Sequence, residues 1–121
     1  MKRGEIWTAA GARDYAGKPR PVLILQDDRF DKTDSITTCG LTTDPEAAPL
    51  FRVRVEPDGT NGLRAPSQVM ADKVTTLART KLGIRVGRLT EEDMLRVNRA
   101  LLVFLGIAGP GASANRVNVT R

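Results

Sequence analysis

The chain has 121 residues, of which 40% are hydrophobic, so it is long enough to bury one core and too short to divide comfortably into two domains. It carries 19 Lys and Arg against 14 Asp and Glu, and the resulting net charge of +5 favours a polyanionic partner such as nucleic acid or an acidic protein segment. The lack of histidine and the single cysteine, Cys39, exclude a histidine general base, an internal disulfide and a thiolate metal cluster. Because we find no signal-peptide pattern and no apolar run of membrane-spanning length, we expect a cytoplasmic protein without membrane contact.

The first half of the chain predicts three strands. Residues 5–10 alternate in the manner of a strand, and a glycine-bracketed loop follows. Residues 21–26 contain a continuous apolar run, which is typical of a central strand buried on both faces. Residues 27–34 form an acidic stretch without the spacing of a calcium loop, so we expect a solvated loop there. A third strand is expected at residues 35–41, which are rich in Thr and Ile.

The second half predicts shorter strands. Residues 51–56 alternate between apolar and charged side chains, so Arg52 and Arg54 are expected to share a solvent-facing side. Glycine, asparagine and aspartate then supply a turn. Further strands are expected at three places: residues 68–71, 74–77 and 83–87.

A C-terminal helix is the clearest predicted element. Thr90 can cap it, with Asp93 at the third helical position. One apolar face consists of Met94, Val97, Leu101 and Phe104, widened by Ala100 and Leu105, and Gly106 and Pro110 end the helix. We expect residues 1–107 to form the domain and residues 108–121 a flexible basic tail. The order of elements predicts a mainly β fold, a curled antiparallel sheet with a C-terminal α-helix packed on it.

Three residues are candidates for chemistry. Arg20 lies between Pro19 and Pro21, which hold its backbone extended, and a fixed guanidinium can clamp a phosphate; the alternative is a surface arginine in a turn. Thr42 follows the third strand, where its hydroxyl could face a groove beside Arg20 or bond locally to the backbone. For Cys39 we expect a small buried hydrophobe rather than a nucleophile.

Four short segments resemble, in order and spacing, the landmarks of the MazF/PemK toxin family. They are Lys2 to Trp7, Arg20 to Ile24, Leu41 to Thr43, and Gly62 to Ser67, and the match extends from Met1 to about Gly106. The resemblance implies an SH3-like barrel of the MazF/CcdB/Kid type, a homodimer, and single-stranded RNA bound along the dimer interface. It also implies a toxin whose partner is an acidic, MazE-like antitoxin.

The resemblance further implies a sequence-specific endoribonuclease that needs neither metal nor cofactor. The ribose 2′-hydroxyl attacks the adjacent phosphorus and leaves a 2′,3′-cyclic phosphate and a 5′-hydroxyl. Arg20 and Thr42 match the family's catalytic arginine and threonine. Other candidate RNA contacts are Arg13, Tyr15, Lys18, Arg52, Arg54, Ser67 and Lys73. Four of them, Arg13, Lys18, Arg52 and Arg54, are equally candidates for contacts with the antitoxin.

The chain departs from the family pattern at two places. Tyr15 stands where many members have a glutamate, which leaves the role assigned to that glutamate open and makes Tyr15 a candidate for stacking on a base. Lys73 and Thr75 replace a glutamine and an arginine of some relatives, so we expect altered base recognition.

Two other functions remain open from the sequence. A DNA gyrase poison resembling CcdB shares this fold, but the tryptophan of such poisons lies near the C-terminus, whereas Trp7 lies near the start here. A non-catalytic nucleic-acid-binding barrel also fits the net charge. The five aromatic residues, some of which must be core, are few for base stacking.

Overall fold

A computed structural model describes residues 1–10, 18–45 and 47–108. Within these residues the strands are β1 (Glu5–Ala9), β2 (Arg20–Ile24), β3 (Ser35–Thr42), β4 (Arg52–Val55), β5 (Ser67–Ala78) and β6 (Leu82–Arg88). The helices are η1 (Asp28–Phe30), η2 (Arg79–Lys81) and α1 (Glu91–Phe104). Arg13, Tyr15 and all of the predicted tail except its first residue, Ala108, lie outside the described residues.

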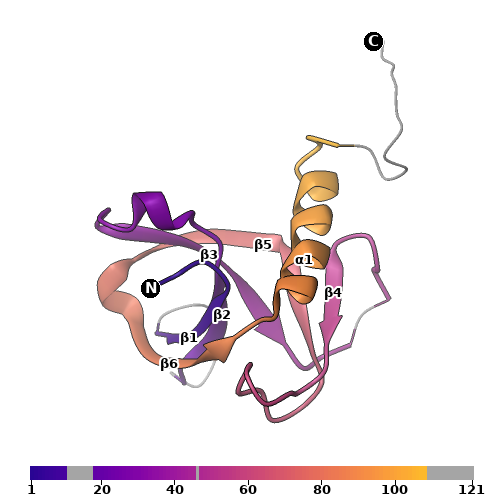
Figure 1. Ribbon diagram of the computed structural model, residues 1–121, viewed down its shortest axis with the longest axis horizontal. Coiled ribbons are helices and arrows are strands. Elements are labelled where there is room, and N and C mark those ends of the chain that lie inside the picture. Colours follow the sequence, from indigo (N-terminus) through magenta and orange to yellow (C-terminus); the bar gives the residue numbers. More distant parts are fainter. Residues whose placement is uncertain (11–17, 46, 109–121) are drawn as a thin grey trace.

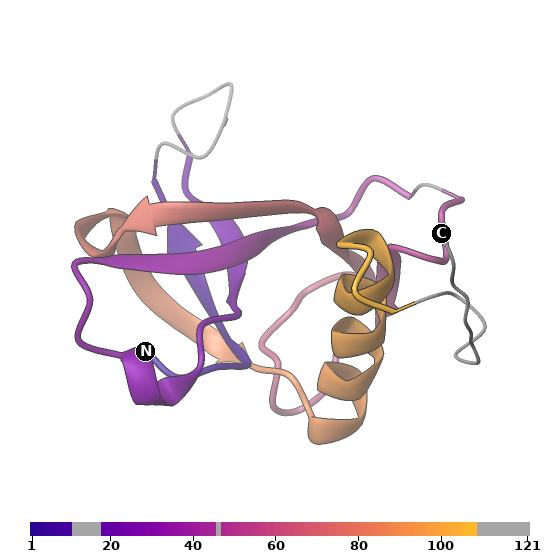
Figure 2. The ribbon, with the colours of Figure 1, turned by 90° about the horizontal axis from the view of Figure 1, so that it is seen from above.

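The strands form one six-stranded antiparallel sheet in the order β4-β5-β3-β2-β1-β6. The sheet is strongly curled, and α1 packs against β4 and β5 at one side of it (Figures 1 and 2). The mainly β fold with a C-terminal helix is therefore confirmed. None of the described helices is long and apolar enough to cross a membrane.

Strand β2 is central and buried on both faces, as predicted. Leu23 belongs to the main core, which lies between the sheet and α1, whereas Val22 and Ile24 belong to a second apolar cluster on the other face. Alternating side chains of one strand point to opposite faces of the sheet, so the two clusters need apolar residues at the three consecutive positions Val22, Leu23 and Ile24. This requirement explains the unbroken apolar run.

Strand β5 is one long, bent strand rather than the two short strands predicted. Cys39 pairs with Val74 and Leu41 with Val69, so β5 advances five residues where β3 advances two. The extra residues form a bulge, and bulges bend a strand and re-aim its side chains. The sequence break near residues 72 and 73 therefore marks the bulge and not the end of a strand.

The helix begins as predicted, since the Thr90 hydroxyl accepts a hydrogen bond from the Asp93 amide at 3.1 Å. Val97 and Ala100 are buried, and Met94 and Leu101 pack against the core. Phe104 is 46% exposed, but its ring lies 5.4 Å from that of Phe51. Leu105 is 56% exposed, so its predicted place on the packed face is wrong. The helix ends before Gly106, whose φ is +75°.

The turn at residues 58–62 packs against the outer edge of β6. The Arg88 amide donates to the Thr60 carbonyl at 2.9 Å, and the buried Asn61 side chain binds three backbone groups within the turn and its flanks. A Cβ on Gly87 would lie 2.4–2.5 Å from the backbone of Thr60 and Asn61, so this close approach requires glycine. The turn thereby covers part of an otherwise open sheet edge.

Candidate functional site

Arg20 and Thr42 lie at the same end of two neighbouring strands. Strand β2 pairs with β3 at Val22 with Gly40, Leu23 with Cys39 and Ile24 with Thr38. Arg20 and Thr42 lie two residues beyond the last of these pairs, at the same end of the two strands. Alternate residues of a strand share a face, so Arg20 lies on the face of Val22 and Thr42 on the face of its partner Gly40. The two predicted catalytic residues are therefore on one face at one end of adjacent strands.

The alignment continues across two further strands. Thr42 pairs with Gln68 of β5, and Gln68 pairs with Arg54 of β4. Arg20, Thr42, Gln68 and Arg54 therefore form one line across the sheet on one face, which we call the end row. Arg20 and Arg54 are exposed, and Thr42 and Gln68 are half-buried. In the end row, the Thr42 hydroxyl and the Gln68 amide therefore lie between two guanidinium groups.

The backbone of Arg20 is held in the sheet while its side chain faces solvent. Arg20 pairs with Ala9, and the following residue, Pro21, pairs with Thr8. Pro21 also disfavours the helical region for Arg20, which agrees with the extended backbone observed. The backbone of Arg20 is therefore held in place and its side chain is exposed, so the guanidinium is available to bind an anionic ligand.

The Thr42 hydroxyl makes the local backbone bond that the sequence left open, because it accepts a hydrogen bond from the Asp44 amide at 3.1 Å. A hydroxyl carries one donor and two acceptor positions. Accepting from Asp44 therefore orients the hydroxyl and still leaves its O–H group as a donor. The turn bond and a catalytic role are compatible.

Arg52 lies on the same face as Arg54, but the prediction that it faces solvent is wrong. Its Nε and Nη2 donate to the two carboxylate oxygens of Asp72 at 2.7 and 2.9 Å, and the two side chains are 8% and 13% exposed. The hydrogen bond from Arg52 lowers the pKa of Asp72 against the opposing effect of burial. Arg54 has a 60% exposed side chain and pairs with exposed Glu56 at 2.6 Å. Of these two arginines, Arg54 is the accessible one.

The other predicted contacts are dispersed. Ser67 is buried, its hydroxyl donates to the Ala65 carbonyl at 3.0 Å, and its strand partner is the core residue Val55. Lys73 is exposed in the bulge of β5, and Lys18 is exposed before β2. The structure therefore places Ser67 on the core face, away from the end row.

Cys39 and the acidic residues Asp27 and Asp28 have structural roles. Cys39 is fully buried, and burial raises the pKa of its thiol to about 12, which agrees with the predicted hydrophobe. In the acidic loop Asp27 caps η1, and Asp28 accepts a hydrogen bond from the Arg3 amide at 2.7 Å. The described residues contain no group of three metal-ligating side chains.

Sequence reasoning missed Gln68, the residue between Thr42 and Arg54 in the end row. Its neighbours Ser67 and Val69 are buried in the core, so strand alternation sends Gln68 to the opposite face. That alternation was readable in the sequence. The pairing of Gln68 with two other strands was not, because it depends on the register of the folded sheet.

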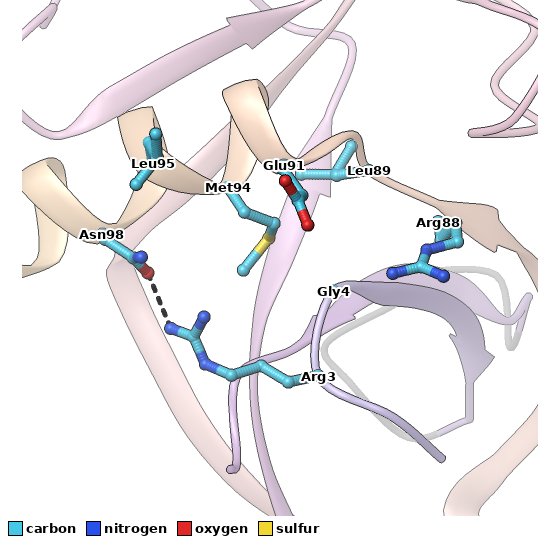
Figure 3. Close-up of a pocket in the computed structure, with 8 residues that line it drawn as sticks. All are labelled: Arg3, Gly4, Arg88, Leu89, Glu91, Met94, Leu95 and Asn98. Atoms are coloured by element: carbon cyan, nitrogen blue, oxygen red, sulfur yellow. Dashed lines mark hydrogen bonds between the residues drawn. The ribbon is translucent and has the colours of Figure 1, made fainter. Parts of the chain in front are cut away.

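A pocket of about 320 Å³ lies at the other end of β1 from the end row, between the start of the chain and α1 (Figure 3). Arg3 crosses it, and its guanidinium donates to the Leu25 carbonyl and to Asn98 Oδ1, each at 2.7 Å. Of the site residues predicted from the sequence that the structure describes, none lines this pocket. Arg3 thus fastens the N-terminal segment to the helix.

The model of a known family matches residues 2–105 and is described as "PemK-like, MazF-like toxin of type II toxin-antitoxin system". The chain belongs to this family. The match covers all six strands and the whole of α1, and it leaves the basic C-terminal segment outside. A relative in Mycolicibacterium smegmatis, called a probable endoribonuclease MazF, is 60% identical over 109 residues, which are 90% of this chain and all of the relative.

Solved structures of MazF-type toxins share the fold. An endoribonuclease in complex with its cognate antitoxin from a mycobacterial species superposes with a TM-score of 0.73 at 26% identity, covering 91% of this chain and 99% of that one. The Mycobacterium tuberculosis toxin MazF-mt6 superposes with a TM-score of 0.72 at 26% identity, covering 84% and 96% of the two chains. The predicted family and barrel fold are thereby confirmed.

Proposed function

We propose that this protein is the toxin of a type II toxin-antitoxin system and a sequence-specific endoribonuclease that cleaves single-stranded RNA without a metal. The end row carries the proposal, because Arg20 and Thr42 lie at the same end of adjacent strands, with a second arginine on the same line. The family match and the endoribonuclease names of the relatives support it. Cleavage of RNA in the cytoplasm would stop translation and growth.

The reaction needs no nucleophile from the protein. The ribose 2′-oxygen attacks the neighbouring phosphorus, the bond from phosphorus to the 5′-oxygen breaks, and a 2′,3′-cyclic phosphate and a 5′-hydroxyl remain. The 2′-hydroxyl proton passes to solvent, and the departing 5′-oxygen takes a proton from solvent. Because the nucleophile is part of the substrate, orientation supplies much of the rate.

Arg20 and Thr42 would divide two tasks. An arginine stays protonated at ordinary pH, so Arg20 acts by electrostatics, binding phosphate oxygens and stabilising the charge that grows on phosphorus. The Thr42 hydroxyl, held by its bond to the Asp44 amide, donates to a phosphate oxygen or orients the 2′-hydroxyl. Exposed Lys18, Arg54 and Lys73 supply the positive field that attracts RNA.

Two partners follow from this function. One is an acidic, MazE-like antitoxin, which would cover these exposed cations and compete with RNA. The mycobacterial endoribonuclease solved with its cognate antitoxin supports this partner. The other is a second copy of the chain. Leu95 and Leu102 are exposed seven residues apart on α1, and exposed Leu105 extends this apolar surface. In this proposal residues 1–107 form the toxin domain and residues 108–121 a basic tail.

The test incubates purified protein in EDTA with a long single-stranded RNA and maps the cut ends. Wild type is compared with Arg20→Ala and Thr42→Ala, and the controls are Arg85→Ala and Thr76→Ala, whose residues lie outside the end row. We expect discrete cuts with cyclic-phosphate ends that both site variants lose and both controls keep. Intact RNA beside a growth-arresting wild type would overturn the proposal in favour of a gyrase poison, and binding without cutting would favour a non-catalytic barrel.

A further inference from the structure

We infer that Gln68 is a specificity-determining residue, which reads the base beside the bond that is cut. This inference rests on the proposed function and assigns one part of it, the choice of RNA sequence, to one side chain. It comes from the register of three strands. Gln68 pairs with Thr42 on one side and with Arg54 on the other.

The spacing of the end row suits a nucleic acid whose phosphates and bases are bound by different side chains. Neighbouring strands lie about 4.8 Å apart, so Gln68 lies about 10 Å from Arg20 across β3, and the two arginines lie about 14 Å apart. Phosphate contacts fix the position of a nucleic acid, whereas contacts to base edges select its sequence. Arg20 and Arg54 have the charge for phosphates. Gln68 is a neutral group between them.

The chemistry of a primary amide suits base reading. Its oxygen accepts and its NH₂ group donates, side by side, so it can pair with a base edge that presents one donor and one acceptor. Sequence-specific proteins read single-stranded RNA through such edges on unstacked bases. In the proposed function Thr42 acts at the reacting phosphate or 2′-hydroxyl, and Gln68 is the next polar side chain along the row.

Packing determines the direction in which Gln68 points. Ser67 and Val69, on either side of it in β5, are buried in the core, so a slip that turned Gln68 inward would expose both. Beside it on the same face, the Met70 methyl lies 2.9 Å from where a Cβ on Gly40 would stand. The side chain of Met70 therefore lies over the Gly40 backbone and forms an apolar floor next to the amide.

Arg52, a neighbouring cation on the same face, is held in an ion pair, so we assign the selection of the base to Gln68. Arg52, which pairs with Met70 in the adjacent position of β4, is held by both carboxylate oxygens of Asp72 in a nearly buried ion pair. A guanidinium bound in this way is compensated and has two of its donors occupied. Arg52 is therefore not the group that we assign to the base at this point, and the assignment falls on the Gln68 amide.

The experiment measures the cleavage motif rather than the rate alone. A single-stranded RNA library with randomised positions is cut by wild type, Gln68→Met and Gln68→Glu, and the cut ends are sequenced. Methionine keeps the length and loses both hydrogen-bonding groups, and we expect it to reduce discrimination at one position of the motif by roughly 10- to 100-fold. Glutamate only accepts, so it should shift preference at that position toward bases that present donors.

The chain offers a matched control in its other glutamine. Gln26 donates to Phe30 and Thr33 and accepts from the Thr37 amide, at the far end of β2 from Arg20. Gln26→Met should lower stability and leave the motif unchanged, so it separates folding effects from recognition. An active Gln68→Met enzyme with the wild-type motif would overturn the inference and leave the nuclease intact. A wild type that cuts no RNA would instead overturn the proposed function.

Discussion

The ion pair between Arg52 and Asp72 gives a prediction that separates structure from recognition. The variants are Arg52→Met, Asp72→Leu and the double replacement. Removing one partner of a fully buried pair costs about 3–5 kcal/mol, because the other charge is left uncompensated. With side chains 8% and 13% exposed, this pair keeps a narrow solvent edge, so we expect each single variant to lose about 2–4 kcal/mol of unfolding free energy. The double variant should lie within about 1 kcal/mol of wild type.

Urea denaturation at pH 7 measures these free energies and completes a double-mutant cycle. A coupling energy below about 1 kcal/mol, the value typical of exposed pairs, would refute the reasoning. The pH adds a second check. The pKa of Asp72 is lowered in the folded state, so its contribution is complete above the unfolded value of about 3.9 and is lost as pH falls through the folded value. The stability gap between wild type and Asp72→Leu should therefore shrink below about pH 4.

Three further predictions concern the fold. Thr90→Ala should lose about 1 kcal/mol of unfolding free energy through the missing helix cap, with exposed Thr80→Ala as the control near zero in the same denaturation assay. Gly87→Ala should cost roughly 3 kcal/mol because its Cβ meets backbone at 2.4–2.5 Å, whereas Gly40→Ala meets only a movable methyl at 2.9 Å and should cost under about 1 kcal/mol. The Cys39 thiol, buried and with a pKa raised to about 12, should resist alkylation at pH 8 until the protein unfolds, as mass spectrometry would show.

The sequence predicted those elements whose periodicity and boundaries are local. The capped helix, the apolar run of β2 and the alternation of β4 are each readable within a few residues. Strand β5 was predicted as two pieces because the bulge interrupts the alternation, and only its pairing with both β3 and β4 shows one strand. Leu105 was assigned to the helix's packed face although the helix has already ended beside it.

Sequence reasoning could propose candidate site residues only where a single residue carries a local signal. Two flanking prolines singled out Arg20, and the position at a strand end singled out Thr42. The burial of Arg52 was not predictable from alternation, since its partner lies 20 residues away on another strand. Gln68 was not singled out for the same reason, because its place in the end row depends on the two strands beside it and not on any local pattern.

The end row depends on three strand pairings, and the fold protects each of them. Between β2 and β3 the register is fixed by core residues on both faces, because a one-residue slip would exchange the two apolar clusters. Between β5 and β4 it is fixed by Val53 and Val69, which pair directly within the main core. The bulge of β5 lies just beyond Ala71, so the strand can bend there without moving Gln68 from its place opposite Thr42. Loops at either side can therefore change while the spacing from Arg20 to Arg54 stays constant.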